Sequence, residues 1–455
     1  AVPTINYVKI TRPDLASPIV LDEAKDGVYV ADYYTTAPAS NDTVEGEENE
    51  VSSGGMLILI SAIFVVLFII AATRASQNRL KLGRREKDVH LVLICLLLAA
   101  LVVRLLLAAL VRGYEVDMNC FEAWAQRMWE VNPWNFYSDE VFCDYPPAYL
   151  LVLWLVGALR NLLGLPYDGP VTWVLIKLTP ILCDMVGAYL VYRLLRRSLG
   201  ENVAALLSLL YALNPAAILN SAAWGQVDSV LTLLLLITLI QAVKGRWIVA
   251  MPVYMLAVLV KPQALLLAPL AMGAMVLEIV KTKDMRATLR QMGIGLALVA
   301  GVLAVMLALF TGGQGLGWLI ELYRETLNSY AYFTVNAMNV YALFGMNWQA
   351  IPEGAGMTLI NGAIYLVIFG YGLYLYIKSG DHRKLFLVGA LILIAIFNFG
   401  FKMHERYVFP AMLLLLVAYG LERDIRLLAA DVLLMVSQFI NIGMVLQNEH
   451  LQSAQ

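Results

Sequence analysis

Charged residues are scarce in this chain. Only 15% of its 455 residues are Asp, Glu, Lys or Arg, whereas 60% are hydrophobic; soluble domains carry about 25% charged residues. The mean hydropathy is +0.72, and runs such as 56–72 and 91–110 approach the roughly 20 residues that a helix needs to cross a bilayer. This composition excludes a water-soluble enzyme and predicts an all-α polytopic membrane protein.

Cysteine is also scarce, with four residues, which excludes a disulfide framework. Cys95 and Cys183 lie in apolar runs, where cysteine behaves as a small hydrophobic residue. Cys120 and Cys143 share one polar segment, and the sequence leaves open whether they pair or stay free.

Several functional motifs are missing. The chain contains no Gly-rich phosphate loop, no zinc-ligand spacing, no Ser-His-Asp arrangement and no nucleic-acid motif. No basic-then-apolar leader follows Ala1, so we expect a trimmed or processed sequence. We also find no convincing internal repeat, which disfavours the repeated halves of many transporters.

The net charge of −2 divides unevenly along the chain. Residues 1–55 hold ten acids against Lys9, Arg12 and Lys25, a net charge of −7, so the rest carries +5. Strand-like pieces at 5–10, 19–21 and 28–34 precede an acidic Gly/Ser linker that reaches Gly55. We expect residues 1–55 to be an extracytoplasmic tail, either the remnant of an upstream domain or a disordered linker.

Basic residues collect in alternate short loops, and such loops face the cytoplasm. Residues 56–88 are therefore expected to form an extra transmembrane helix and a basic cytoplasmic loop. The segment Pro146–Leu165 is long enough to cross, but a crossing there would place the later basic loops outside, so we predict an interfacial or re-entrant helix instead. The predicted spans are 56–73, 89–111, 171–193, 203–220, 229–244, 247–260, 263–280, 291–311, 357–377, 385–401, 408–421 and 427–446.

This routing of about twelve spans, with both ends outside, brings the unusual polar residues to one extracytoplasmic face. Ionisable residues near a membrane boundary are costly and are functional candidates by default. Carboxylates suit activation of a hydroxyl, and cations suit a phosphate. The candidates are Glu115, Asp117, Asp144, Tyr145, Asp228, Lys261, Arg324, Lys402, His404, Glu405 and Arg406.

Three motifs in this set point to a family. Gly113–Ala125 followed by Asp144–Tyr149, Trp224–Ser229 with Lys261-Pro262-Gln263, and His404–Tyr407 occur in that order. Residues 89–421 thus resemble the GT-C superfamily of membrane glycosyltransferases, within it the bacterial mannosyltransferase-like members related to the GPI-anchor mannosyltransferases. The resemblance implies that residues 89–455 form a GT-C-like catalytic domain, and it leaves the tail and first span unexplained.

The resemblance implies inverting transfer of a sugar, mannose above all, from a polyprenyl-phosphate donor to a glycan, lipid or protein acceptor. Asp117 matches the acidic residue of the family's first loop, which takes the proton of the acceptor hydroxyl. Lys261, His404 and Arg406 would contact the donor phosphate, with Glu405 orienting one of them. The expected location is the bacterial plasma membrane, with the site outside and no nucleic-acid partner.

Each candidate also has a purely structural explanation. Asp117 could cap a helix that begins near Met118, and Asp144 could cap one that begins at Pro146. Lys261 could snorkel to the headgroups. Trp224–Asp228 could be an ordinary outer loop, and the aromatic residues of 311–351, around Arg324, could form an interfacial belt.

A divalent cation is a further open question. Glu115 and Asp117 form an acid-x-acid pair, which binds Mg²⁺ or Mn²⁺ in some relatives but is also common in solvated loops. The rival function is a lipid-linked sugar flippase or transporter, which would place its polar residues near the bilayer midplane. A ligase that transfers a whole lipid-linked glycan is a third hypothesis.

Overall fold

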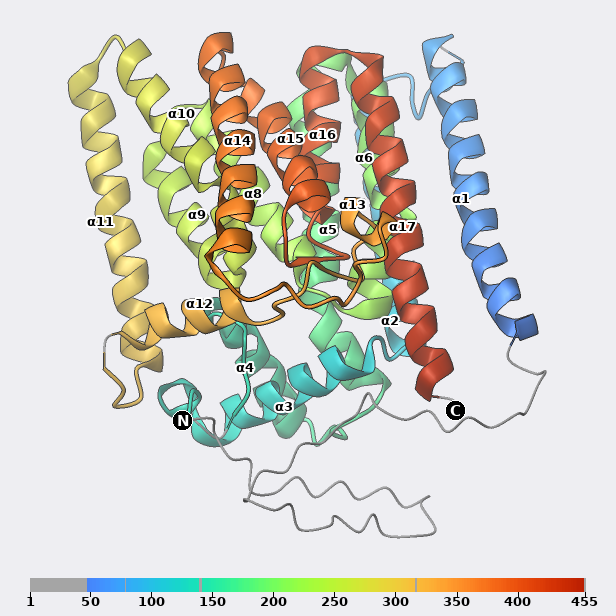
Figure 1. The fold of residues 1–455 in the computed structure, drawn as a ribbon. Coiled ribbons are helices and arrows are strands. Elements are labelled where there is room, and N and C mark those ends of the chain that lie inside the picture. Colours follow the sequence, from blue (N-terminus) through green and yellow to red (C-terminus); the bar gives the residue numbers. More distant parts are fainter. Residues whose placement is uncertain (1–46, 78, 139–140, 316, 454–455) are drawn as a thin grey trace.

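The protein is a bundle of helices with almost no strand, as the computed structural model in Figure 1 shows. The structure describes residues 47–77, 79–138, 141–315 and 317–453. The strand-like pieces expected in the tail lie outside these residues. The expected linker does not extend to Gly55, because helix α1 (Glu47–Ser76) already begins at Glu47.

Seven helical segments among the described residues are long and apolar enough to cross a membrane, and a bent pair makes an eighth. The protein is therefore an all-α polytopic membrane protein. The seven are built on α1, α2 (Glu86–Leu110), α5 (Pro170–Leu199), η3 with α10 (Pro262–Lys281), α11 (Met285–Phe310), α14 (Ala355–Ser379) and α17 (Ile425–Ser453).

The bent pair replaces the continuous span expected at 203–220. Helix α6 (Glu201–Ala212) ends before Pro215, and α7 (Pro215–Ile218) continues at an angle of 46° into the π-helical turn η2 (Leu219–Trp224). Proline lacks the N–H that would continue the first helix. The Asn214 side chain restarts the chain by accepting a hydrogen bond from the Ala216 N–H at 3.0 Å.

Four other predicted spans are short helices. They are α8 (Asp228–Val243), α9 (Trp247–Val260), α15 (Lys384–Phe399) and α16 (Phe409–Glu422). With 14 to 16 residues each, they extend about 21 to 24 Å, less than the roughly 30 Å hydrocarbon thickness of a bilayer. Every predicted span thus falls on a helix or a broken helix, but length alone supports a crossing only for the longer ones.

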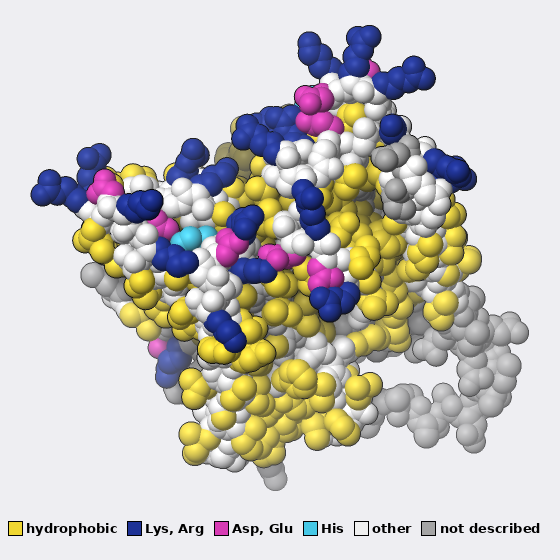
Figure 2. All heavy atoms as spheres, turned by 90° about the horizontal axis from the view of Figure 1, so that it is seen from above, with side chains coloured by type: hydrophobic (Ala, Val, Ile, Leu, Met, Phe, Trp, Pro, Cys, Tyr) yellow, Lys and Arg dark blue, Asp and Glu magenta, His cyan; other side chains and the backbone are white. Residues whose placement is uncertain are grey.

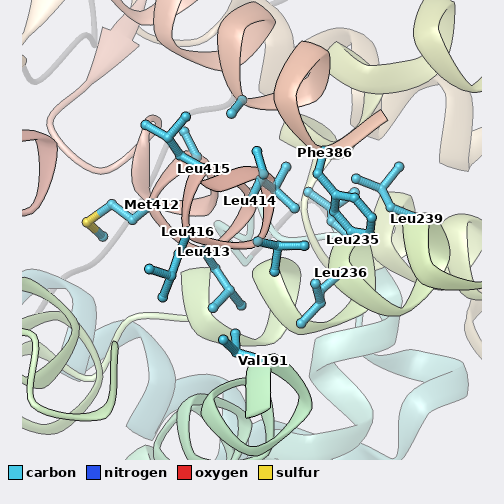
Figure 3. Packing of buried hydrophobic residues seen from close by; sticks show 14 of the residues in the cluster. Val191, Leu235, Leu236, Leu239, Phe386, Met412, Leu413, Leu414, Leu415 and Leu416 are labelled. Carbon is cyan, nitrogen blue, oxygen red and sulfur yellow. The ribbon is translucent and has the colours of Figure 1, made fainter. Parts of the chain in front are cut away.

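Helix α16 lies at the centre of the bundle. It is apolar around its whole circumference, which is the pattern of a helix buried on all sides. Figure 3 shows Leu413 and Leu414 of α16 among side chains of α5, α8 and α15. Gly420 permits the close approach to α5, since a Cβ there would lie 2.3 Å from Leu195 Cδ1.

One end of the bundle gathers the basic loops, as the charge bias predicts. Figure 2 views the molecule from that end and shows Lys and Arg side chains across it. Hydrogen bonds tie loops that are distant in sequence: Leu82 N–H donates to Asn202, and Arg423 donates to the Ser198 carbonyl. The contacts support assignment of these loops to one side of the membrane.

The opposite end carries the helices that do not run along the bundle. Helix α3 (Glu115–Val131) crosses this end, and α4 (Pro147–Leu162) packs against it (Figure 1). The segment 311–351, expected to be a long loop, contains α12 (Trp318–Asn328), the strand β1 (Thr334–Val335) and α13 (Val340–Leu343). Strand β1 pairs in parallel with β2 (Met403–His404), which joins this segment to the His404–Tyr407 motif.

Candidate functional site

The polar residues singled out in the sequence lie where the short helices end. Asp228 is the first residue of α8, Lys261 directly follows α9, and Arg406 lies between α15 and α16. Helices shorter than the bilayer leave room for side chains between their ends and the covering layer of α3 and α12. The short helices therefore create the place in which these residues meet.

Asp228 and Lys261 form a buried ion pair. Lys261 Nζ donates to Asp228 Oδ1 at 2.6 Å, and the two side chains are 11% and 0% exposed, respectively. Snorkelling is therefore wrong for Lys261, and Asp228 does not lie in an exposed loop. Removing one member of such a pair would leave the other charge buried and uncompensated, which is strongly unfavourable.

Arg406 connects this pair to two further carboxylates. Its Nη1 lies 2.5 Å from Glu405 Oε1 and 3.7 Å from Asp117 Oδ2, and its Nε lies 3.7 Å from Asp228 Oδ2. The guanidinium also stacks over Trp224, 4.5 Å from the ring centroid. Burial alone would lower the pKa of Arg406, but Glu405, then Asp117 and Asp228, raise it, so this residue is a permanent cation.

Asp117 lies at the open side of the network. Its side chain is 26% exposed, and its Oδ2 accepts hydrogen bonds from Trp224 Nε1 at 2.6 Å and from Gln226 Nε2. Helix α3 begins at Glu115 with Tyr114 as its cap, so Asp117 is inside the first turn and the capping explanation is wrong. A carboxylate in a first helical turn is stabilised by the helix dipole.

Trp224 and Gln226 are site residues that the sequence did not single out individually. They lay in a run that resembled an outer loop, but in the structure both are buried. Gly225 between them has a φ of +93°, a conformation that glycine adopts readily, and turns both side chains toward Asp117. The indication in the sequence was a glycine flanked by Trp224 and Gln226, two residues with hydrogen-bonding side chains, shortly before Asp228.

Asp144 and Tyr145 lie on the same side of the network as Asp117. The N-cap of α4 is Pro146, without a side-chain bond, so Asp144 is not its cap. Burial, and next the Asp117 carboxylate, raise the pKa of Asp144 to about 6. Tyr145 Oη donates to Gln226 Oε1 at 3.3 Å, which links this segment to the residue that holds Asp117.

His404 is an uncharged member of the site. Its ring lies 4.8 Å from the Tyr330 ring and 5.0 Å from the Tyr407 ring, measured between centroids. Burial, with Arg406 and Lys261 next, lowers its pKa to about 3, so at neutral pH His404 offers a hydrogen bond and no positive charge. Lys402 points elsewhere, since its Nζ donates to the Leu327 carbonyl at 3.0 Å.

Besides Lys402, two candidates lie on exposed helix surfaces. Arg324 is exposed on α12 and forms an ion pair with Glu321. Glu115 is exposed two residues before Asp117, and side chains at i and i+2 of a helix do not face each other. The described residues contain no group of three or more His, Cys, Asp or Glu placed to hold a metal ion.

The two loop cysteines are free. Cys143 donates to the Tyr145 carbonyl at 3.7 Å and packs in the core beneath α3, and Cys120 is separately half-buried. Burial, then Asp117, raises the pKa of Cys120 to about 11, which favours the protonated thiol over the nucleophilic thiolate at neutral pH.

Several buried polar atoms around the network lack a hydrogen-bond partner among the described residues. They include Asp228 Oδ2, Arg406 Nε, Gln263 Oε1 and both side-chain polar atoms of Asn220. Buried polar groups are normally paired, and each exception calls for an explanation. Asp228 Oδ2 and Arg406 Nε still form an ion pair with each other at 3.7 Å, a distance too long for a hydrogen bond.

The fold and the network together define a polytopic helical membrane protein with a buried ionic site at one end of its bundle. In a comparison with protein families, residues 122–336 match the family described as GPI transamidase subunit PIG-U, a family related to the GPI anchor. The match spans just under half of the chain and includes Asp228 and Lys261, but neither Asp117 nor Arg406. A comparison with curated proteins gives no significant match.

Proposed function

We propose that this protein is a membrane glycosyltransferase that moves a sugar, mannose above all, from a polyprenyl-phosphate donor to a glycan, lipid or protein acceptor. The observation that carries the proposal is the contact of Asp117, a partly exposed carboxylate, with the buried cation Arg406. A base and a phosphate-binding cation side by side are what transfer from a phosphate-linked sugar requires. The resemblance of residues 89–421 to the GT-C superfamily supports the same conclusion.

In the proposed reaction, the acceptor hydroxyl approaches Asp117 from the open side of the site. Its oxygen attacks the anomeric carbon and forms the new glycosidic bond, while Asp117 takes the proton. The bond between the anomeric carbon and the phosphate oxygen breaks, and its electrons leave with polyprenyl phosphate. A single displacement inverts the anomeric configuration and needs only one carboxylate, in contrast to the two of a glycosidase.

The charges of the network suggest how the donor enters. Arg406 contacts three carboxylates, so an incoming phosphate must replace one of them. Its contact with Glu405 is 2.5 Å, and its contacts with Asp117 and Asp228 are both 3.7 Å. Asp228 is fully buried and is also paired with Lys261, so the partly exposed Asp117 is the carboxylate that a phosphate would replace. Exchange of Asp117 for phosphate would leave Arg406 charge-balanced and release Asp117 to act as the base.

We further propose twelve spans in a GT-C-like arrangement in the bacterial plasma membrane, with the site on the extracytoplasmic side. The basic loops at the opposite end support this orientation. We propose that Asp117 acts as the base without a metal ion, because side chains at i and i+2 of a helix do not face each other.

A second candidate function follows from the family match. A PIG-U-like subunit of a GPI transamidase would use the same network to hold a lipid-linked glycan without transferring a sugar. A lipid-linked sugar flippase is less favoured, since the network lies at one end of the bundle rather than between repeated halves.

The deciding experiment incubates purified protein with labelled polyprenyl-phosphate mannose and a panel of glycan, lipid and peptide acceptors. Release of polyprenyl phosphate that depends on an acceptor and on Asp117 supports the transferase. Binding of the labelled lipid without release would support the subunit, and movement of intact lipid between leaflets would support the flippase.

A further inference from the structure

Lys177 is a buried lysine that neither the sequence motifs nor the proposed reaction uses. It lies on α5, and its side chain is 0% exposed. Its Nζ donates to the Val111 carbonyl at 2.5 Å and to the Ala223 carbonyl at 2.9 Å. One ammonium group thus joins the chain just after α2 to the last turn of η2.

Both carbonyls lie at the C-terminal ends of helical segments. The terminal carbonyls of a helix lack partners within it and carry partial negative charge. A buried ammonium is correspondingly costly unless several acceptors surround it. Lys177 therefore supplies the hydrogen-bond donors that the Val111 and Ala223 carbonyls lack. These two hydrogen bonds fix the distance between the end of α2 and the end of η2.

Two glycines show how tightly the segments are held. Gly113 lies two residues after Val111 and has a φ of +107°. A Cβ on Gly113 would lie 2.4 Å from the Trp224 carbonyl oxygen. A Cβ on Gly225 would lie 3.1 Å from Lys177 Cγ. The chain between α2 and α3 is thus pressed against the residue that donates to Asp117.

Asp117 is reached from Lys177 by two routes. Val111 leads through Gly113 into the first turn of α3, which carries Asp117. Ala223 leads into Trp224 and Gln226, which donate to the Asp117 carboxylate. We propose that Lys177 is a positioning residue that sets the Asp117 carboxylate against its two donors; a catalytic role for Asp117 rests on the function proposed above.

The first test measures the Trp224–Asp117 hydrogen bond and needs no activity. In protein labelled with ¹⁵N at the tryptophan indoles, the Trp224 resonance is assigned by its loss in Trp224→Phe, and Asp117→Ala gives its position without the bond. We expect Lys177→Met, which keeps the stem and removes the ammonium, to move the resonance toward that position. Lys177→Arg, which restores a cation, should move it back at least in part.

The matched control is Thr172→Val. Thr172 is buried on the same helix and donates one hydrogen bond to a carbonyl, that of Pro166, away from the route to Asp117. We expect the control to leave the Trp224 resonance in place. An unmoved resonance in folded Lys177→Met, or an equal shift in the control, would overturn the proposal.

The second test uses the transferase assay. Displacement of a reacting group by about 1 Å costs on the order of 10²-fold in rate, so Lys177→Met should lower kcat by about that factor and change the donor KM little. A KM increase at unchanged kcat would overturn the positioning role. If wild-type protein transfers no sugar while the resonance shifts as expected, the proposed function fails and the positioning of Asp117 by Lys177 stands.

Discussion

The two ends of the bundle use the same ionic residues in opposite ways. At the end with the basic loops, Arg426 pairs with Asp424 two residues away, and its side chain is 87% exposed. At the other end, Arg406 and Lys261 are buried and pair with carboxylates brought together from different helices. Exposed pairs contribute about 0 to 1 kcal/mol, whereas breaking a buried pair costs several kcal/mol. One end carries exposed ion pairs between neighbouring residues, and the other holds a buried ionic network.

The largest expected effect comes from the one network carboxylate that is partly exposed. Asp117→Asn removes the base but keeps an oxygen that accepts from Trp224, so we expect kcat to fall by about 10³-fold with an unchanged thermal midpoint. The measurement is release of polyprenyl phosphate from labelled donor. Glu115→Gln, an exposed acid on the same helical turn, should stay within about threefold; comparable loss in both variants would remove Asp117 from its special role.

The next effect is on stability. Lys261→Met leaves the buried Asp228 with only the more distant Arg406, at 3.7 Å, as a cationic partner, and we expect a loss of about 3 kcal/mol in the free energy of unfolding. Arg426→Met at the opposite end should cost no more than about 1 kcal/mol. Unfolding of both variants in the same detergent, followed by fluorescence, gives the comparison. Equal losses of unfolding free energy in the two variants would contradict the claim that buried pairs at one end stabilise the protein more than exposed pairs at the other.

A smaller effect should appear in the pH dependence of stability. The pKa of Asp144 is raised from 3.8 to about 6 by burial and then by Asp117. The folded protein therefore keeps a proton that the unfolded chain releases between about pH 4 and pH 6, and rising pH across that window favours unfolding. Asp144→Asn should flatten the fall in thermal midpoint over that range, whereas Glu353→Gln, in an exposed loop, should leave the slope as it is.

The smallest expected effect is that of chelation. Because Glu115 and Asp117 point to different sides of α3, we expect transferase activity to remain complete in excess EDTA. Activity that disappears with EDTA and returns with Mg²⁺ or Mn²⁺ would show that the network binds a metal after rearrangement.

The sequence predicted much of the fold because membrane insertion depends on local composition. All twelve predicted spans fall on helices or on a broken helix, and the placement of Pro146–Leu165 outside the membrane stays a prediction. It did not predict the break at Pro215 or the helical start at Glu47. Both depend on capping and packing that hydropathy does not describe.

The members of the ionic network were predicted in part. Asp117, Asp228, Lys261 and Arg406 were identified because ionisable residues stand out in an apolar chain. The sequence did not single out Trp224, Gln226 or Lys177 individually. Their roles depend on the carboxylate or carbonyl to which each side chain donates in the folded protein. Arg324 was included for its proximity to aromatic residues, whereas in the structure it pairs with Glu321. Residue type indicates that a site exists, and tertiary contacts decide its members.

The short helices also have a consequence for the surrounding lipid. A bilayer whose hydrocarbon layer is thicker than a protein's apolar surface must thin locally, or the protein must tilt, at a cost of fractions of a kcal/mol per ångström. Beside α9 and α15, which expose Val249 and Leu391 at the surface of the bundle, the helices end about 6 to 9 Å short of the usual thickness. Lipid headgroups beside these helices would sink toward the site, so a lipid-borne phosphate could reach Arg406 while its own chain stays in the membrane.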